Sequence, residues 1–168
     1  MISLLRQRRS IRQFLAQPIK AEKIDILKEA ALRAPSSRNR NPWEFYFVTD
    51  AKLLERLSHA KPHGAGFLSR APLGIVVVGL PQKSDAWIED TSIASIVLQL
   101  TAQSQGLGSC WIQIRMREHD ENTSADAFVK SVLDIPEDHR VESIIAVGYP
   151  GEAKEGIPAS KLETEKIK

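Results

Sequence analysis

The segment Trp87–Gln105 constrains the fold more than any other part of the chain. Apolar residues cover nearly the whole circumference of a helix drawn through it, and the thin polar stripe that remains consists of Glu89, Ser92, Gln99 and Gln103. A helix that is apolar all round is buried, either inside one chain or between two chains. Gly106 and Gly108 then end it. We therefore expect a central buried helix with other elements, or a second copy of the chain, packed around it.

Hydrophobic periodicity predicts four strands that alternate with helices. The strands are expected at 44–49, 73–79, 109–114 and 141–147, and the helices at 2–9, 24–34, 52–59, 87–105 and 124–133. Pro35 closes the second helix, and Asp50 and Ser124 are candidate N-caps. No internal repeat or boundary interrupts the pattern. It favours a single domain over residues 1–168, with either a compact α+β fold or a three-layer α/β/α sandwich, and a charged tail from about residue 152.

Composition limits the classes of protein that the chain could belong to. The formal net charge of +2 over 168 residues is too small to indicate nucleic-acid binding by itself. No run of about 18 apolar residues predicts a membrane span, and no signal peptide is visible, so a cytoplasmic protein is expected. Cys110 is the only cysteine, which excludes an internal disulfide. His59 and His63 are separated by Pro62, which prevents a helical metal pair, so we expect no metal.

A compact group of basic residues near the N-terminus is the strongest chemical signal. Arg8-Arg9-Ser10-Ile11-Arg12 contains three arginines and one hydroxyl group. The planar guanidinium group matches the oxygens of a phosphate. Arg8 and Arg12 are four residues apart and are expected to share a helix face. The simpler interpretation, a solvated basic helix end, stays open.

A second polar motif follows the second predicted helix. Ser36, Ser37 and Asn39 lie between Pro35 and the Pro-Trp pair that ends at Trp43. A loop bounded by prolines cannot continue a helix, so its donors are free to meet a ligand, although serine and asparagine are also ordinary turn residues. The aromatic ring anchors the loop on the core. Together the two motifs suggest a phosphate-bearing cofactor that is held by its charged end and by a polar ring edge.

Other candidate groups receive simpler interpretations. Gly106-Leu107-Gly108 lacks the spacing of a dinucleotide fingerprint, and no Walker motif is present. Cys110 lies in an apolar strand and is interpreted as a small buried residue. The acidic residues Asp85, Glu89 and Asp90 are interpreted as favourable charges at the start of a helix rather than as a catalytic pair.

Four motifs in order give the chain a family resemblance over essentially its whole length. They are RRSIRQF, APSSRNRNPWEF, GLGSCWIQI and AVGYPGE. The chain resembles the nitroreductase-like flavoproteins, which are FMN-dependent NAD(P)H oxidoreductases. The resemblance implies a sandwich with a mixed sheet, a central buried helix and a homodimer whose flavin sites lie at the subunit interface.

The resemblance also implies which residues hold the flavin. Near the N-terminus, the residues that bind the phosphate and ribityl chain are Arg8, Arg9 and Ser10. Arg12 lies near the N1/O2 edge of the ring. The partner subunit contributes Pro35, Ser36, Ser37 and Asn39. The strand beside the ring contributes Trp111, Ile112 and Gln113, with a backbone N–H of about Gln113 reaching N5. A phosphate-binding basic residue after the Gly-Tyr-Pro motif is assigned to Lys161.

The expected activity is hydride transfer from NADH or NADPH through flavin N5 to a small acceptor, such as a nitroaromatic compound or a quinone, by a ping-pong mechanism. No side chain is expected to act as a catalytic acid or base. One alternative is a flavin-binding sensor or carrier without turnover. Another is a nucleic-acid-binding module that uses the clusters Arg6–Arg12 and Arg33–Arg40, which predicts binding with a steep salt dependence.

Overall fold

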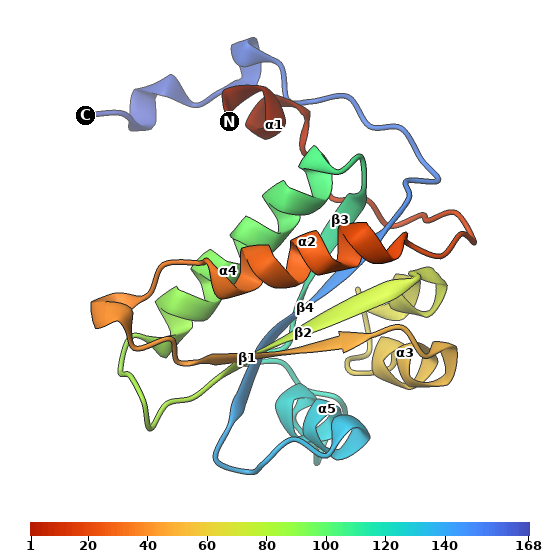
Figure 1. The fold of residues 1–168 in the computed structure, drawn as a ribbon, viewed down its shortest axis with the longest axis vertical. Coiled ribbons are helices and arrows are strands. Elements are labelled where there is room, and N and C mark those ends of the chain that lie inside the picture. The colour runs from red at the N-terminus through yellow and green to blue at the C-terminus, as the bar shows by residue number, and fades with distance from the viewer.

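Helices and strands form where the sequence patterns predict them, with bounds that differ by a few residues (Figure 1). The computed structural model describes residues 1–168. Its elements are α1 (Ile2–Gln7), α2 (Ala21–Leu32), β1 (Trp43–Val48), α3 (Ala51–Ser58), β2 (Leu73–Gly79), α4 (Trp87–Ser104), β3 (Gly108–Gln113), α5 (Ala125–Leu133) and β4 (Arg140–Gly148). Helix α2 ends at Leu32, before Pro35, because the residue that precedes a proline disfavours helical geometry.

The four strands form one sheet in the order β1-β2-β4-β3. Each neighbouring pair is antiparallel, so the expectation of a mixed sheet is wrong for these strands. The reason is the position of β4: it lies between β2 and β3, which run in the same direction, and is antiparallel to both. The single parallel contact is an isolated bridge between Ser10 and Ser109 at the edge of β3.

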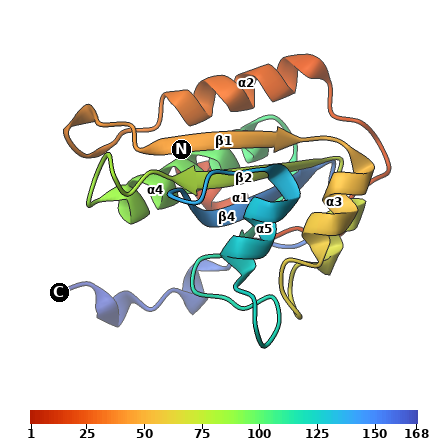
Figure 2. The same ribbon diagram turned by 90° about the horizontal axis from the view of Figure 1, so that it is seen from below.

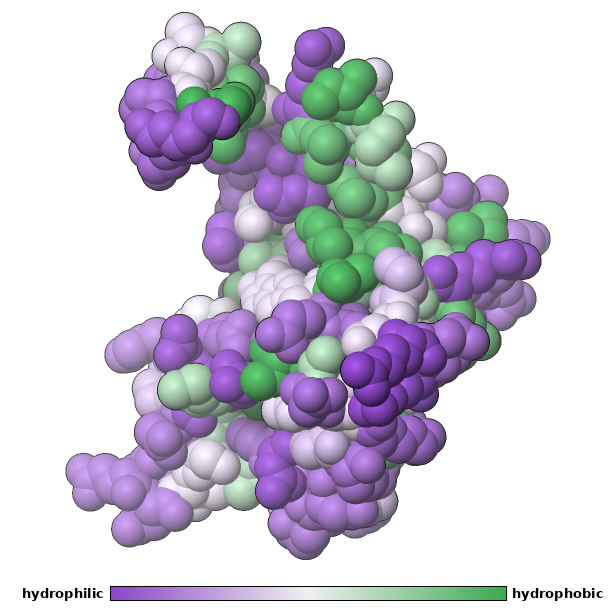
Figure 3. All heavy atoms as spheres, turned by 90° about the vertical axis from the view of Figure 1, so that its left-hand side faces the viewer, coloured by the Kyte–Doolittle hydropathy of each residue, from purple (hydrophilic) through white to green (hydrophobic).

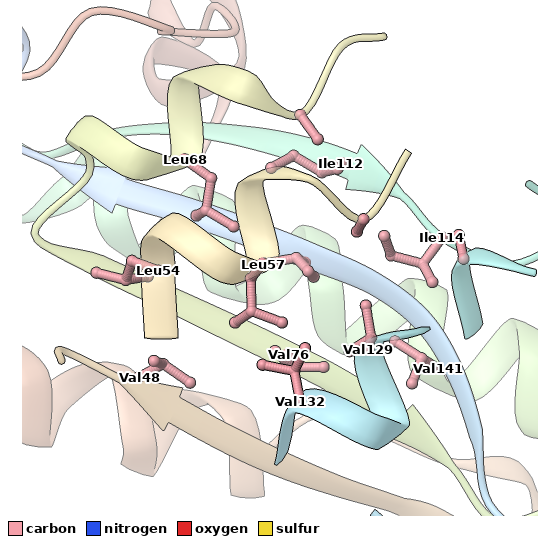
Figure 4. Packing of buried hydrophobic residues seen from close by; sticks show 14 of the residues in the cluster. Val48, Leu54, Leu57, Leu68, Val76, Ile112, Ile114, Val129, Val132 and Val141 are labelled. Carbon is pink, nitrogen blue, oxygen red and sulfur yellow. The ribbon is translucent and has the colours of Figure 1, made fainter. Parts of the chain in front are cut away.

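The sheet has a layer of helices on each face, which confirms the α/β/α sandwich. Helices α2 and α4 cover one face, while α3, α5 and the short 3-10 helix Gly66–Arg70 cover the other (Figures 1 and 2). Strand β2 is buried along its whole length, as its uninterrupted apolar sequence predicts. On the α3/α5 side, leucines of α3 and valines of α5 converge on Val76 of β2 (Figure 4).

Local signals at three positions place these elements. The side chain of Asp50 accepts a hydrogen bond from the Leu53 N–H at 2.9 Å and caps α3. Ser124 caps α5 in the same way through the Ala127 N–H at 3.1 Å. Gly79, at the end of β2, lets α4 begin close to the sheet: a Cβ there would lie 2.1 Å from the ring of Trp87. Both predicted caps are therefore confirmed.

Helix α4 is buried on the side that faces the sheet, but part of its apolar surface stays open. Leu98 is fully buried and Gln99, which was expected in the polar stripe, is buried too. Ile93 and Ile96 remain 39% and 38% exposed. Figure 3 views the molecule from the left-hand side of Figure 1 and shows hydrophobic side chains gathered into a band bordered by hydrophilic ones. None of the helices is long and apolar enough to cross a lipid bilayer.

Candidate functional site

The Arg8–Arg12 segment is extended and lies along the free edge of β3. Helix α1 ends at Gln7 and Arg8 has a ψ of 125°, so the expected helix face shared by Arg8 and Arg12 does not exist. The Ile11 N–H instead donates to the Ser109 carbonyl at 3.0 Å. Ile11 can come this close to β3 only because the strand starts with a glycine: a Cβ on Gly108 would lie 2.9 Å from Ile11. Main-chain pairing with an edge strand therefore replaces the helix.

The polypeptide after β4 folds back onto this segment and brings Lys154 to it. The Lys154 ammonium donates to the Ser10 carbonyl at 2.9 Å, and Glu152 accepts a hydrogen bond from the Arg12 N–H at 2.6 Å. Arg9 donates to the Glu155 carbonyl. Lys161, the lysine expected here, instead ends an exposed turn, Ala159–Lys161, farther along the tail. The lysine that the structure places against the Arg8–Arg12 segment is therefore Lys154, which the sequence interpretation did not single out.

Sequence contained one signal that could have identified Lys154. Pro150, in the Gly-Tyr-Pro motif, forms a bridge with Phe14. The Gly151 N–H also donates to the Gln13 carbonyl at 2.8 Å. These contacts fix the chain beside the basic segment, so a lysine that follows within a few residues must lie close to Ser10. Lys161 is too far along the chain to be held by the same bridge.

Positive charge converges around Cys110 at the start of β3. Arg8, Arg12 and Lys154 all favour the thiolate of this buried residue, but burial outweighs them and raises the pKa of the thiol. Lys61, from the loop after α3, also interacts with Cys110. Cys110 is thus buried, as expected, and the four cations around it are the more informative feature.

These cations have few acidic partners. Arg8, Arg12 and Lys61 form no ion pair with an acidic side chain, whereas Lys154 pairs with Glu152 at 3.0 Å. Burial, and next the guanidinium group of Arg117, lower the pKa of Lys61. An anion would relieve this repulsion, and a phosphate suits arginine geometry. The donor set therefore fits a phosphate-bearing ligand.

A cleft of about 430 Å³ opens beside the extended segment, and its lining includes Arg9, Ile11, Gly106, Gly108, Pro150 and Lys154. On the other side of the segment, the Arg12 guanidinium lies 5.9 Å from the centre of the Phe67 ring. Phe67 belongs to the 3-10 helix Gly66–Arg70. The loop after α3 therefore supplies two site neighbours, Lys61 and Phe67, that no sequence motif indicated.

Backbone donors line the edge of β3 beyond the point where Ile11 pairs with it. Strand residues alternate between bonding to β4 and facing outward, and the Ser109 carbonyl faces outward because Ile11 bonds to it. The N–H groups of Trp111 and Gln113 face the same free edge. Their side chains are linked, since the Trp111 indole N–H donates to the Gln113 amide oxygen at 2.9 Å. This edge is suited to polar atoms on the rim of a planar ring.

Ile112 differs from its two neighbours on β3. Its side chain is 1% exposed and belongs to the core cluster on the α3/α5 face. Trp111 packs against the cluster on the opposite face. The strand alternation therefore turns the Ile112 side chain into the core, so this residue has only main-chain atoms to offer at the free edge.

The second motif forms a tight loop with an unusual backbone. Arg38, Asn39 and Asn41 have φ values of 51°, 55° and 47°, which place them in the left-handed region that asparagine tolerates better than most residues. Within the loop, the Asn41 N–H donates to the Ser36 hydroxyl oxygen at 3.0 Å. Trp43 is buried and anchors the end of the loop, as expected. An internal hydrogen bond and a buried aromatic anchor therefore hold the loop in this conformation.

Asp90 supports this loop from α4. Its Oδ1 accepts a hydrogen bond from the Ser37 N–H at 2.8 Å, the residue is 3% exposed, and its Oδ2 has no partner. Asp85 pairs instead with Arg40 at 3.6 Å, and Glu89 is exposed. The interpretation of all three as acidic residues of a first helical turn is therefore incomplete. The available signal for Asp90 was its position in the first turn of a helix that the sequence predicts to be buried.

The two motifs lie at opposite ends of α4 (Figure 1). The loop contacts Asp90 in the first turns of the helix, whereas Ser10 pairs with β3 just beyond its last turn. The rise of an α-helix puts about 20 Å between those ends. One chain therefore does not bring Ser37 and Ser10 to one place.

Comparison with known proteins gives a consistent result. The family model described as "Nitroreductase family" matches residues 5–63 and 59–149. A curated protein of Archaeoglobus fulgidus, provisionally named an NADH dehydrogenase/NAD(P)H nitroreductase, is 35% identical over 158 residues, which cover 92% of this chain and 87% of that protein.

Solved structures have the same fold. An FMN-dependent nitroreductase from Clostridium difficile R20291 has a TM-score of 0.98 and 43% identity, covering 100% of this chain and 98% of that one. A nitroreductase family protein from Clostridium novyi NT has a TM-score of 0.80 and 26% identity, covering 90% and 85% of the two chains. The family expected from the four motifs is confirmed: the chain belongs to the Nitroreductase family.

Proposed function

We propose that this protein is an FMN-dependent oxidoreductase that passes hydride from NADH or NADPH to a small acceptor, such as a nitroaromatic compound or a quinone, in a ping-pong reaction. The observation that carries the proposal is the convergence of Arg8, Arg12 and Lys61, none of them ion-paired, beside the free N–H groups of β3. The name of the Clostridium difficile structure, an FMN-dependent nitroreductase, supports the same cofactor.

The cationic end of the site holds the phosphate in this proposal. Arg8, Arg9 and Ser10 supply guanidinium and hydroxyl donors, and Lys154 supplies the additional positive charge that was first assigned to Lys161. The segment is held in place by main-chain pairing with β3, so its donors keep a fixed position. Fixed donors bind an anion with little loss of conformational entropy.

The other end of the site controls the electronic state of the ring. FMN supplies the two-electron chemistry, because its ring accepts and returns a hydride. Arg12 lies beside Phe67, where its positive charge stabilises the negative charge that reduction adds. The Gln113 N–H faces the free edge of β3 and is the backbone donor to the reacting side of the ring. No acid or base from the protein is required.

A homodimer completes the site in this proposal. Pro35, Ser36, Ser37 and Asn39 lie about 20 Å from Ser10 along α4 in their own chain. A twofold axis that packs α4 against its copy brings this loop to the basic segment of the other chain, and covers the exposed Ile93 and Ile96. The band of hydrophobic side chains in Figure 3 supports such an interface.

The visible absorption spectrum tests the proposal. The purified protein is mixed with FMN and desalted, and the retained flavin is then treated with NADH or NADPH without oxygen. We expect a bound flavin spectrum that bleaches and then recovers when a quinone or nitroaromatic acceptor is added. A colourless protein contradicts the proposal. A bound flavin that neither nucleotide bleaches favours the alternative of a sensor or carrier.

A further inference from the structure

Glu142 lies on β4 at an irregularity in the sheet. The pairing of β4 with β2 passes from Ser143 opposite Val77 to Val141 opposite Val78, so Glu142 has no partner on β2. Its carbonyl oxygen accepts hydrogen bonds from the Ile114 and Arg115 N–H groups at 3.2 and 3.1 Å. A β-bulge of this kind changes the direction of a side chain, and such bulges are common beside active sites.

The carboxyl group of Glu142 is buried next to the strand that borders the proposed flavin site. The residue is 4% exposed, and its Oε2 has no hydrogen-bond partner. The Gln113 side-chain amide lowers the pKa of this carboxyl group, and the Arg115 Nε lies 3.9 Å from Oε2. Gln113 is also the residue whose backbone N–H faces the free edge of β3. One residue thus separates the buried carboxyl group from the proposed position of the flavin.

The surroundings act on this carboxyl group in two opposite directions. Burial raises the pKa of Glu142, while Arg115 and the Gln113 amide act in the opposite direction. Arg115 is the charged group that acts on it. From α4, the uncharged Trp87 ring lies 6.0 Å from the Arg115 guanidinium, and the Ser95 hydroxyl is hydrogen-bonded to the Ser143 hydroxyl. Because few other charges act on Glu142, a new charge beside Gln113 strongly affects whether Glu142 binds a proton.

We propose that Glu142 binds a proton from solvent when flavin at the free edge of β3 is reduced, and so links flavin reduction to pH. This inference rests on the proposed function. Hydride transfer oxidises NAD(P)H to NAD(P)⁺ and places two electrons and one proton on the flavin, which adds one negative charge beside Gln113. That charge disfavours the Glu142 carboxylate, which takes the second proton. The holoenzyme thus takes up more than one proton per two electrons over the pH interval in which Glu142 titrates.

The pH dependence of the flavin midpoint potential tests this inference. Glu142→Gln keeps the shape of the side chain but cannot titrate, and Glu118→Gln, at an exposed position just after β3, is the matched control. In the wild type and in E118Q, we expect the slope to rise from one proton toward two protons per two electrons within the interval. In E142Q, the additional proton should be absent. Equal slopes in the wild type and E142Q overturn the inference.

A second variant tests the direction of the effect. The Arg115 guanidinium lowers the pKa of Glu142, so Arg115→Met should move the steep interval to higher pH. An interval that stays in place or moves to lower pH contradicts the assignment to Glu142.

An infrared measurement on the wild type avoids dependence on the folding of any variant. The reduced-minus-oxidised difference spectrum should gain a protonated carboxyl C=O band, and its absence overturns the inference.

The proposed function and the role of Glu142 are contradicted by different results. A wild-type protein that binds no FMN contradicts the proposed function, whereas bound FMN without additional proton uptake contradicts the role of Glu142 alone.

Discussion

The buried carboxylate of Asp90 accepts a hydrogen bond from the Ser37 backbone N–H at 2.8 Å, and this contact joins α4 to the serine/asparagine loop. Three residues of that loop have left-handed backbone angles, which a free loop would seldom adopt together. The acceptor belongs to a carboxyl group that is itself buried, which strengthens the contact. Asp90 therefore sets the position in which the loop presents its donors.

Replacing Asp90 should weaken cofactor binding. Hydrogen bonds to charged groups contribute about 1.5–3 kcal/mol, so Asp90→Ala should lower FMN affinity by about tenfold or more. Asp90→Asn keeps the oxygen that accepts from Ser37 and should retain most of the affinity. Glu89→Ala, at the exposed neighbouring position, is the control. Fluorescence titration of FMN measures all three, and wild-type affinity in a folded D90A protein would contradict the role of Asp90.

Arg12→Ala should reduce both FMN affinity and the rate of flavin reduction. The variant removes a cation that has no acidic partner and that lies 5.9 Å from the Phe67 ring. Because developing negative charge on the ring loses its stabilisation, we expect at least about a tenfold fall in rate. Arg12→Lys should restore part of the rate, since it keeps the charge but not the planar group. Stopped-flow reduction by NADH or NADPH gives the rate, and an unchanged rate in R12A would refute the proposed position of the ring.

Lys130 should prove important for stability rather than for activity. It is 5% exposed and pairs with Asp126 at 3.3 Å and with Glu137 at 2.9 Å. Lys130→Met leaves the partly buried Asp126 carboxylate unpaired and should lower the free energy of unfolding by about 2–3 kcal/mol. Lys28→Met breaks an exposed ion pair with Asp25 and should change the free energy of unfolding by less than about 0.5 kcal/mol. Urea unfolding of the two variants compares them directly, and equal stabilities would show that burial of Lys130 adds nothing.

Without any cofactor, Glu142 should make stability depend on pH. Its pKa in the folded chain is raised above the usual 4.5, so its protonated form is the one that folding favours. The stability it contributes is therefore fully present below about pH 4.5 and is lost as the pH rises through the folded pKa. Relative to the wild type, Glu142→Gln should thus gain stability with increasing pH across that interval. Urea unfolding of both proteins at a series of pH values measures the difference, and parallel pH profiles would contradict the raised pKa.

Sequence predicts the elements of this fold because their signals are local. The apolar run of β2 and the caps at Asp50 and Ser124 each depend on residues within one turn or strand. Burial of α4 also follows from its own composition. Whether the sheet is mixed or antiparallel depends instead on which strand inserts between which others, and no local pattern records that choice.

The sequence reveals the motifs of the candidate site but not the residues that chain reversal brings close to them. The arginine segment and the serine/asparagine loop can be recognised in the sequence. Lys154 and Lys61 cannot, because they come close to Cys110 through turns whose paths depend on tertiary contacts. The same limit explains the extended Arg8–Arg12 segment. Its local spacing suits a helix, and pairing of Ile11 with Ser109 overrides that preference.

The separation of the two motifs along α4 has a genetic consequence. If each site combines the arginine segment of one chain with the loop of the other, an R12A chain and a D90A chain damage opposite halves of a site. A mixed dimer then contains one site with both defects and one with neither. Random pairing at equal expression makes half of the dimers mixed, so about one quarter of all sites should be free of both defects in cells that express both impaired chains. Two defective copies of the gene should therefore complement each other, which a protein with a self-contained site could not do.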